Sequence, residues 1–435
     1  MKHTHLFLFF LSASLFAQHS FAQHEPLVDR LASSIESEII ELRHWFHQNA
    51  ELSNREFKTA ARIAEELTKL GLEPEIEVAH TGVVAVLEGG LPGPVVALRA
   101  DIDGLPVNER CNIPWASRMM GTYNGDKVPV MHACGHDTHI AILLGVAKVM
   151  TEIRDQIPGT IKFIFQPAEE GAPAGEEGGA ELMVKEGVLK DPDVDAIFGL
   201  HIASYIPVGQ IAVRSGSIMA AADAFRIDIQ GVQTHGSTPW SGVDPIVTAA
   251  QMINSMQTIV SRNMELTKAA TVLTIGSIHG GIRSNIIPEK LYMLGTLRSL
   301  DNDMKELAKT RLREVVEAIA KVNGAEATLE FQGSYPITFN DPALFDQMFP
   351  TLEKTAGEEN VFIIPSITGA EDFSFFQEQV PGLYFFLGGI AEGTKPEDSA
   401  PHHTPDFFVD DSSMLLGIKT MSNLTLDFMK SQHNE

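Results

Sequence analysis

Cysteine is scarce in this chain, with only Cys111 and Cys134 among 435 residues. Such a low content excludes a fold held together by several disulfides. The two could still pair in an exported protein, but Cys134 lies between His132 and His136, a position that suits a metal-bound thiolate. We therefore predict that Cys134 is a metal ligand and that Cys111 is a thiol with no assigned function.

Basic residues are few relative to acidic ones. The 32 lysines and arginines stand against 57 aspartates and glutamates, which gives a formal net charge of -25. A surface this acidic repels the phosphates of nucleic acids and the headgroups of anionic lipids. Neither nucleic acid nor a membrane is therefore an expected partner of the mature protein.

Long apolar runs are also missing. The N-terminal run from Leu6 to Leu11 is shorter than the ~20 residues that a membrane span requires. It follows a short basic start and precedes small residues ending at Ala22, an order typical of a secretory signal peptide. We predict cleavage near Ala22 and export to the periplasm or beyond the cell; a membrane anchor is the alternative.

Apolar segments of strand length alternate with amphipathic helices in the first half of the chain. A chain of 435 residues exceeds what one core usually organises, so two domains are expected. The alternation predicts an α/β layer structure with a largely buried sheet. The strands are expected at 83–87, 95–98, 161–165 and 196–200, and the helices at 35–46, 57–70, 140–150 and 178–186.

The pattern changes near Met219. The segments that follow have the order β-α-β-β-α-β, which is typical of a ferredoxin-like domain: 224–230, 243–262, 270–275, 290–300, 303–322 and 327–332. After Tyr335 the α/β pattern returns, with a strand at 383–387 and a final helix at 411–429. We predict a signal peptide (1–22), a catalytic domain in two parts (23–218 and 334–435) and an inserted domain (219–333).

Reactive side chains follow three of the expected strands at the point where each strand ends. Asp101 and Asp103 follow the second strand, Glu169 and Glu170 the third, and His201 the fourth. In open α/β sheets, ligands bind beyond the carboxyl ends of the strands. We therefore expect these side chains to meet at one edge of the sheet.

The segment from His132 to His139 stands directly before an apolar helix. Thiolate and imidazole ligands suit zinc, manganese, cobalt or nickel rather than calcium or magnesium, and a helix start stabilises a thiolate. Asp137 is predicted to orient a ligating imidazole or to bridge the site. The alternative is a histidine-rich surface loop, which the cysteine among the histidines disfavours.

Two further motifs carry candidate groups. Glu169 and Glu170 lie behind Pro167 and before a Gly-rich loop, where one carboxylate can hold a metal while the other takes a proton from water. The alternative is a pair of glutamates on a solvated helix. His402 and His403 lie between two prolines late in the chain and are candidate metal ligands.

These motifs resemble those of the two-metal exopeptidase family M20, in particular its amidohydrolase branch of hippurate hydrolases, N-acyl-amino-acid amidohydrolases and plant auxin-conjugate hydrolases. The resemblance covers nearly all of the mature chain in the same order and is carried by segments 99–106, 132–137, 166–170, 199–201, 285–288, 295–298 and 369–373. It implies an α/β fold with a mixed-sheet catalytic domain and an inserted ferredoxin-like lid and dimerisation domain, hence a homodimer.

The resemblance also implies a metal-binding set. Two divalent metals, zinc or manganese with cobalt or nickel as alternatives, would be bound by Cys134, His136, Glu170, His201 and His403. Cys134 would bridge the two metals, where other branches use an aspartate. His403 is preferred over His402 because it directly precedes a small residue and a proline.

Further roles follow from the same resemblance. Glu169 would be the general base. His235, in a segment that departs from the commoner Gly-Gly-His-Ala-Ala form, would stabilise the oxyanion in its own or a partner subunit's site. Asn285 and Arg298 would recognise the free carboxylate of the substrate. Asp103, like Asp137, would support the ligands.

The expected reaction is hydrolysis of the amide bond of an N-acyl amino acid. The nearest rival is a carboxypeptidase or dipeptidase on the same scaffold, which differs only in the group on the acyl side. A rival of another class is a periplasmic binding protein descended from such an enzyme. The presence of every expected ligand and of the base argues against that rival.

Overall fold

The computed structural model describes residues 24–433. The predicted signal peptide and its cleavage site near Ala22 lie outside the described residues. The chain divides into two compact units. Unit 2 comprises Ser217–Phe339 and Pro365–Ser374, and unit 1 comprises the rest. Unit 2 corresponds to the expected inserted domain, 219–333, but its limits differ. It also contains the segment 365–374, which the sequence did not assign to it and in which Ile367 pairs with Met219.

Unit 1 is built on an eight-stranded mixed sheet with the order β1-β2-β6-β3-β7-β18-β8-β17. Strand β3 runs parallel to both β6 and β7, and β7 runs parallel to β18. The mixed α/β architecture expected from the sequence is confirmed. The strands are β1 (Glu75–Val78), β2 (Gly82–Glu88), β3 (Leu91–Asp101), β6 (Pro158–Gln166), β7 (Ala196–Pro207), β8 (Ile211–Val213), β17 (Val361–Ile363) and β18 (Gly382–Ile390).

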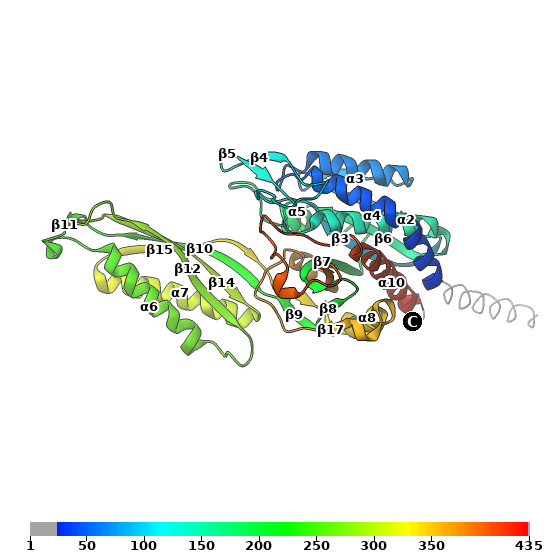
Figure 1. Ribbon diagram of the computed structural model, residues 1–435. Helices are drawn as coiled ribbons and strands as arrows, with labels where there is room; N and C mark the ends of the chain where they lie inside the picture. The colour runs from blue at the N-terminus through cyan, green and yellow to red at the C-terminus, as the bar shows by residue number, and fades with distance from the viewer. Residues whose placement is uncertain (1–23, 434–435) are drawn as a thin grey trace, which may run out of the picture. The chain divides into compact units, whose positions relative to one another are not determined.

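Three long helices of unit 1 pack on one another, and two of them, α4 and α10, also pack on β3 (Figure 1). Helix α4 is buried on nearly every side, which explains why its sequence is apolar all round rather than on one stripe. The helices are α2 (His24–Gln48), α3 (Phe57–Lys69), α4 (His136–Glu152), α5 (Gly179–Lys185), α8 (Pro342–Ala356), α9 (Ser374–Gln377) and α10 (Ser413–His433). None of the helices between residues 24 and 433 combines the length and apolar character needed to cross a bilayer.

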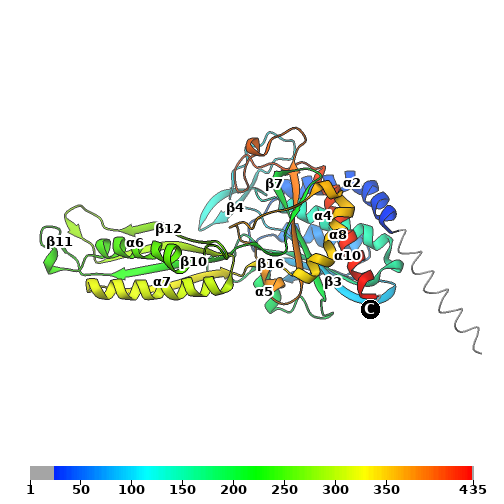
Figure 2. The same cartoon turned by 90° about the horizontal axis from the view of Figure 1, so that it is seen from below.

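Unit 2 has an antiparallel four-stranded sheet with the order β12-β14-β10-β15, and α6 and α7 lie along one face of it (Figure 2). Chain order and strand order together confirm the ferredoxin-like arrangement. Asp244 and Asp301 cap the two helices by accepting hydrogen bonds from their first-turn amides. The elements are β10 (Ala221–Gln230), α6 (Pro245–Asn263), β12 (Thr271–Gly280), β14 (Lys290–Ser299), α7 (Asn302–Asn323) and β15 (Glu326–Tyr335).

Short strand pairs complete both units. In unit 2, β11 (Thr234–His235) pairs with β13 (Ile286–Ile287). At the two points where the chain passes from one unit to the other, β9 (Gly216–Met219) pairs with β16 (Thr338–Asn340). In unit 1, β4 (Met119–Tyr123) and β5 (Asp126–Val130) form a hairpin.

Candidate metal centre

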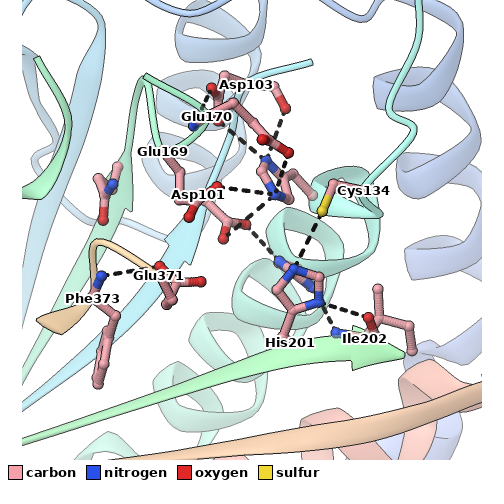
Figure 3. Close-up of polar contacts among 12 residues, drawn as sticks. Asp101, Asp103, Cys134, Glu169, Glu170, His201, Ile202, Glu371 and Phe373 are labelled. Atoms are coloured by element: carbon pink, nitrogen blue, oxygen red, sulfur yellow. Dashed lines mark hydrogen bonds and ion pairs between the residues drawn. The ribbon is translucent and has the colours of Figure 1, made fainter. Parts of the chain in front are cut away.

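Neighbouring parallel strands bring polar side chains to one edge of the unit 1 sheet. β3 ends at Asp101, β6 ends three residues before Glu169, and β7 carries His201. Figure 3 shows these side chains facing one another, with Cys134, two residues before α4, beside His201. The convergence expected from the strand ends is therefore present.

The sulfur of Cys134 is the shared member of two groups of donor atoms. One group is Cys134, His136 and His201, and the other is Cys134, Glu170 and His403; within each group the atoms lie within 4.8 Å of one another. Sγ lies 3.4 Å from Nε2 of His201 and 3.3 Å from Nε2 of His403. The structure thus brings together all five residues predicted to bind metal.

Two of the histidines present the same ring nitrogen to the centre. Nδ1 of His136 donates to the main-chain carbonyl of Asp103 at 2.9 Å and lies 3.1 Å from its carboxylate. Nδ1 of His201 donates to the carbonyl of Ile202 at 2.6 Å. Because carbonyls only accept, the proton of each neutral ring is on Nδ1 and the lone pair of Nε2 is left for the centre. Asp103 thus contacts the ring of His136 with its carbonyl and with its carboxylate.

The donor set fits divalent cations. Nε2 of His136 lies 3.8 Å from Asp101, 3.9 Å from Glu169 and 4.0 Å from Glu170. This nitrogen is buried and makes no hydrogen bond. Unsatisfied buried polar atoms are costly, and a thiol, imidazoles and carboxylates facing one another are the ligands that zinc and similar metals prefer.

Charge in the centre supports the same conclusion. Burial, together with the nearby carboxylates of Glu170 and Glu169, raises the pKa of the Cys134 thiol well above its usual range. Burial opposes the charged form of His136, but Asp101, Asp103 and Glu170 outweigh it and raise its pKa to about 10. An excess of negative charge of this kind is what a bound cation neutralises.

The contacts that hold Asp101, and the part played by His139, were not predicted from the sequence. Oδ2 of Asp101 accepts from Arg99 at 2.8 Å, and Oδ1 accepts from Nδ1 of His139 at 2.5 Å. Nε2 of His139 in turn accepts the amide of Ile202 at 2.8 Å, next to His201. Asp101 is thereby held in place behind the ligands. The i, i+3 spacing of His136 and His139 on one helix is the sequence signal that places both rings on the same side of α4.

Asp137 does not have the role predicted for it. Its Oδ2 accepts from Nε of Arg43 and from Nδ1 of His47, each at 3.0 Å, and neither belongs to the predicted ligand set. Successive residues on a helix point about 100° apart, so the side chain next to His136 leaves the centre. Asp137 instead joins α4 to α2 through a buried ion pair.

Gly135 sets the path of the chain between Cys134 and His136. Its φ of 94° is in the left-handed region, and a Cβ there would lie 2.3 Å from the side chain of Ile202. A glycine is therefore required where the loop turns into α4.

The two late histidines both contact the centre, in different ways. Nε2 of His403 lies 3.0 Å from Oε1 of Glu170 and 3.3 Å from Sγ of Cys134. His402 approaches the same sulfur with Nδ1, at 3.6 Å, while its Nε2 accepts the amide of Ser204 at 3.1 Å. From the sequence, His402 was a candidate metal ligand along with His403, and the resemblance preferred His403.

The remaining predicted residues belong to unit 2. His235 is an exposed residue of β11 whose Nδ1 accepts from Ser237. Asn285 lies beside it, since its carbonyl accepts the amide of Gly236. Arg298 lies on β14, half-buried, where Nη1 donates to Thr296 at 2.7 Å. The structure places His235 with Asn285, and Arg298 apart from both.

Known proteins resemble this chain over most of its length. Residues 97–427 match peptidase family M20/M25/M40. The chain is 40% identical to thermostable carboxypeptidase 2 of Saccharolobus solfataricus, covering 92% of this chain and 99% of that protein. It is 37% identical to N-acetyl-L-cysteine deacetylase of Bacillus subtilis, covering 88% and 86%. A crystal structure of a Bacillus subtilis dinuclear metal binding peptidase from the M20 family has a TM-score of 0.75 and 31% identity, covering 92% and 99%.

The fold, the donor cluster and these relatives together define a metal-dependent hydrolase. The mixed sheet and the inserted ferredoxin-like unit match the solved M20 structure over nearly the whole chain. The chain belongs to peptidase family M20, in its amidohydrolase branch.

Proposed function

We propose that the protein hydrolyses the amide bond of N-acyl amino acids and releases a carboxylic acid and a free amino acid. The observation that carries this proposal is the Cys134 sulfur, which two groups of donors share. The resemblance assigns a cysteine at this position to the amidohydrolase branch. The 37% identity to a protein named N-acetyl-L-cysteine deacetylase, whose substrate is an N-acyl amino acid, supports the same substrate class.

The proposed ligands divide between two cations. His136 and His201 would bind one, Glu170 and His403 would bind the other, and Cys134 would bind both. Zinc or manganese is the proposed metal, with cobalt or nickel as alternatives, because thiolate and imidazole donors favour these ions.

Glu169 is proposed to move the protons of the reaction. When bound, two divalent cations polarise the scissile carbonyl and lower the pKa of the attacking water. The carboxylate of Glu169 is largely buried and lies beside His136 Nε2, at 3.9 Å. It takes a proton from the water as the C–O bond forms and gives it to the leaving nitrogen as the C–N bond breaks.

Unit 2 is proposed to supply His235 for the oxyanion and Asn285 and Arg298 for the substrate carboxylate. Lys290 and Arg298 are eight residues apart on β14, or about 26 Å at the rise of a strand. His235 pairs with Ile286, beyond the Lys290 end (Figure 1). A substrate of two residues spans only about 7 Å.

One chain therefore cannot present both His235 and Arg298 to one such substrate. A homodimer in which each site receives His235 of the partner subunit resolves this, and we propose that the protein is such a dimer.

A carboxypeptidase is the second candidate, because the chain is 40% identical to a protein named thermostable carboxypeptidase 2. The two activities differ in the group attached to the scissile carbonyl. Comparing kcat/KM for N-acetyl and N-benzoyl amino acids with that for unblocked dipeptides, using protein reloaded with Zn²⁺ or Mn²⁺, tests the proposal. Higher values for the N-acyl substrates are expected; a preference for the dipeptides would favour the second candidate.

Export remains a proposal from the sequence alone. Expression of the whole chain in a bacterium, followed by intact-mass measurement of the periplasmic fraction, should find a protein that starts at Gln23. A full-length protein confined to the cytosol would contradict export.

A further inference from the structure

His402 contacts the proposed metal centre with a different ring nitrogen from that of His136 and His201. Its Nε2 accepts the main-chain amide of Ser204 at 3.1 Å, so that nitrogen carries no proton. The single proton of the neutral ring is then on Nδ1, which lies 3.6 Å from Sγ of Cys134. His402 therefore faces Cys134 with a proton and not with a lone pair.

The surroundings of the ring keep it in this orientation. The ring centroid lies 4.7 Å from that of Phe407 and 6.2 Å from that of Tyr205. The hydroxyl of Ser204 donates to the carbonyl of Ala400 at 2.9 Å and so fixes the loop that precedes His402. A flipped ring would place a carbon against the Ser204 amide and lose this hydrogen bond, and the other neutral tautomer would place an N–H against the amide, which is also a donor.

We propose that His402 is a positioning residue that donates a hydrogen bond to the Cys134 sulfur, and is not itself a metal ligand. The inference rests on the proposed function only in taking Cys134 as a ligand. It explains why both His402 and His403 contact one sulfur: His403 supplies a lone pair to a cation, and His402 supplies a proton to the thiolate.

The donor has a definite energetic role. A thiolate at Cys134 lies close to the carboxylates of Glu169 and Glu170, so forming it is unfavourable before the cations bind. A hydrogen bond from a neutral N–H stabilises the sulfur anion without adding a charge that would repel the cations. It also removes electron density from the sulfur, as hydrogen bonds to metal-bound sulfur do elsewhere.

The test uses Co²⁺ alone as the probe, on the full chain in a Cys111→Ser background, so that Cys134 is the only thiol. Co²⁺ is titrated into the metal-free protein while the thiolate-to-cobalt absorption band and the bound metal per chain are measured. The variants are His402→Phe, which keeps the ring shape without a donor, His402→Gln, which can donate and accept, and His403→Phe as the ligand control.

The expected result separates the two histidines. His402→Phe should still bind two Co²⁺ per chain, with an affinity about 10- to 100-fold weaker and the band moved to longer wavelength. His402→Gln should return both values towards the wild type, and His403→Phe should lose one cation.

Three outcomes would overturn the inference. Loss of one cation in His402→Phe would make His402 a ligand. If the thiolate-to-cobalt band and the Co²⁺ affinity of His402→Phe are unchanged, the His402 ring contributes only packing. Absence of any thiolate band in the unsubstituted His402 protein would remove Cys134 as the acceptor. The band does not depend on turnover, so failure to hydrolyse N-acyl amino acids would count against the proposed function alone.

Discussion

Glu169 and Glu170 are adjacent in sequence but have different neighbours. Oε1 of Glu170 lies 3.0 Å from Nε2 of His403, and the main-chain amide of Glu170 donates to the carboxylate of Asp103 at 3.1 Å. The positive φ of Ala168, 52°, turns the chain just before the pair. Both carboxylates approach Nε2 of His136, Glu169 at 3.9 Å and Glu170 at 4.0 Å, and Glu170 in addition faces His403. This division is what a base and a ligand in consecutive positions require.

Glu169→Gln should lower kcat on an N-acetyl amino acid by about 10²- to 10⁴-fold, because an amide cannot accept the proton of water. Its metal content, measured by plasma mass spectrometry, should stay at the wild-type level. Glu170→Gln is the matched control and should lose metal as well as activity. A Glu169→Gln enzyme with wild-type kcat would exclude Glu169 as the base.

The candidate ligands were predictable from the sequence because each motif is local. Cys134 and His136 lie within three residues, and the strand ends bring Glu170 and His201 to them. The direction of a side chain was not predictable where distant residues decide it. Asp137 faces Arg43 and His47, which are 94 and 90 positions away along the chain. His402 likewise depends on the amide of Ser204, 198 positions away.

At the scale of elements, the start of α4 controls the geometry of the centre. Gly135→Ala would combine an unfavourable left-handed backbone with a clash against Ile202. We expect a loss of about 2–4 kcal/mol in the free energy of unfolding and weaker metal binding. Denaturant titrations and metal analysis check this.

Gly187→Ala is the control for Gly135→Ala. Gly187 has a similar φ of 87°, but a Cβ there meets nothing within 4 Å. It should show the backbone penalty alone and keep its metal. Equal losses in the two variants would show that contact with Ile202 does not matter.

The ion pairs between α2 and α4 make stability depend on pH. Burial opposes the charged form of His47, but Asp137 and Glu109 outweigh it and raise the pKa to about 9. A histidine whose pKa is raised stabilises the fold fully below its unfolded value, about 6.5, and loses this contribution as pH rises through 9.

The stability advantage of the wild type over His47→Gln should therefore fall by about 3 kcal/mol between pH 6 and pH 10. Urea unfolding at a series of pH values measures it. In a Glu109→Gln background the fall should be smaller, because one of the groups that raise the pKa is gone. If the stability advantage of the wild type over His47→Gln instead grows with pH, His47 is not protonated in the folded protein as assigned.

The order of the elements followed from hydrophobic period, since long apolar strands and amphipathic helices differ in their spacing. The predicted helix 303–322 and the observed α7 (Asn302–Asn323) differ by one residue at each end. The segment Pro365–Ser374 was not assigned to unit 2, because its pairing with Met219 joins residues far apart in sequence. Hydrophobic periodicity is a local pattern and carries no information about contacts between residues so far apart in sequence.

For the whole molecule, the distance along β14 is the feature with the largest consequence. His235 and Arg298 belong to one unit but lie at opposite ends of its sheet. If both act on one small substrate, they come from different chains, and the sites of a dimer are shared. Two inactive variants can then restore each other.

We predict that Glu169→Gln and His235→Ala, each inactive alone, regain activity when they are unfolded together and refolded as a mixture. Half of the dimers are then mixed, and in each of them one site combines Glu169 of one chain with His235 of the other. The expected recovery is therefore about a quarter of the wild-type activity for a symmetric dimer. Light scattering must show dimers throughout, and separately refolded variants that are mixed afterwards serve as the control. No recovery in a mixture that is dimeric would place His235 in the site of its own chain, and Arg298 would then have to lose its role in binding the same substrate.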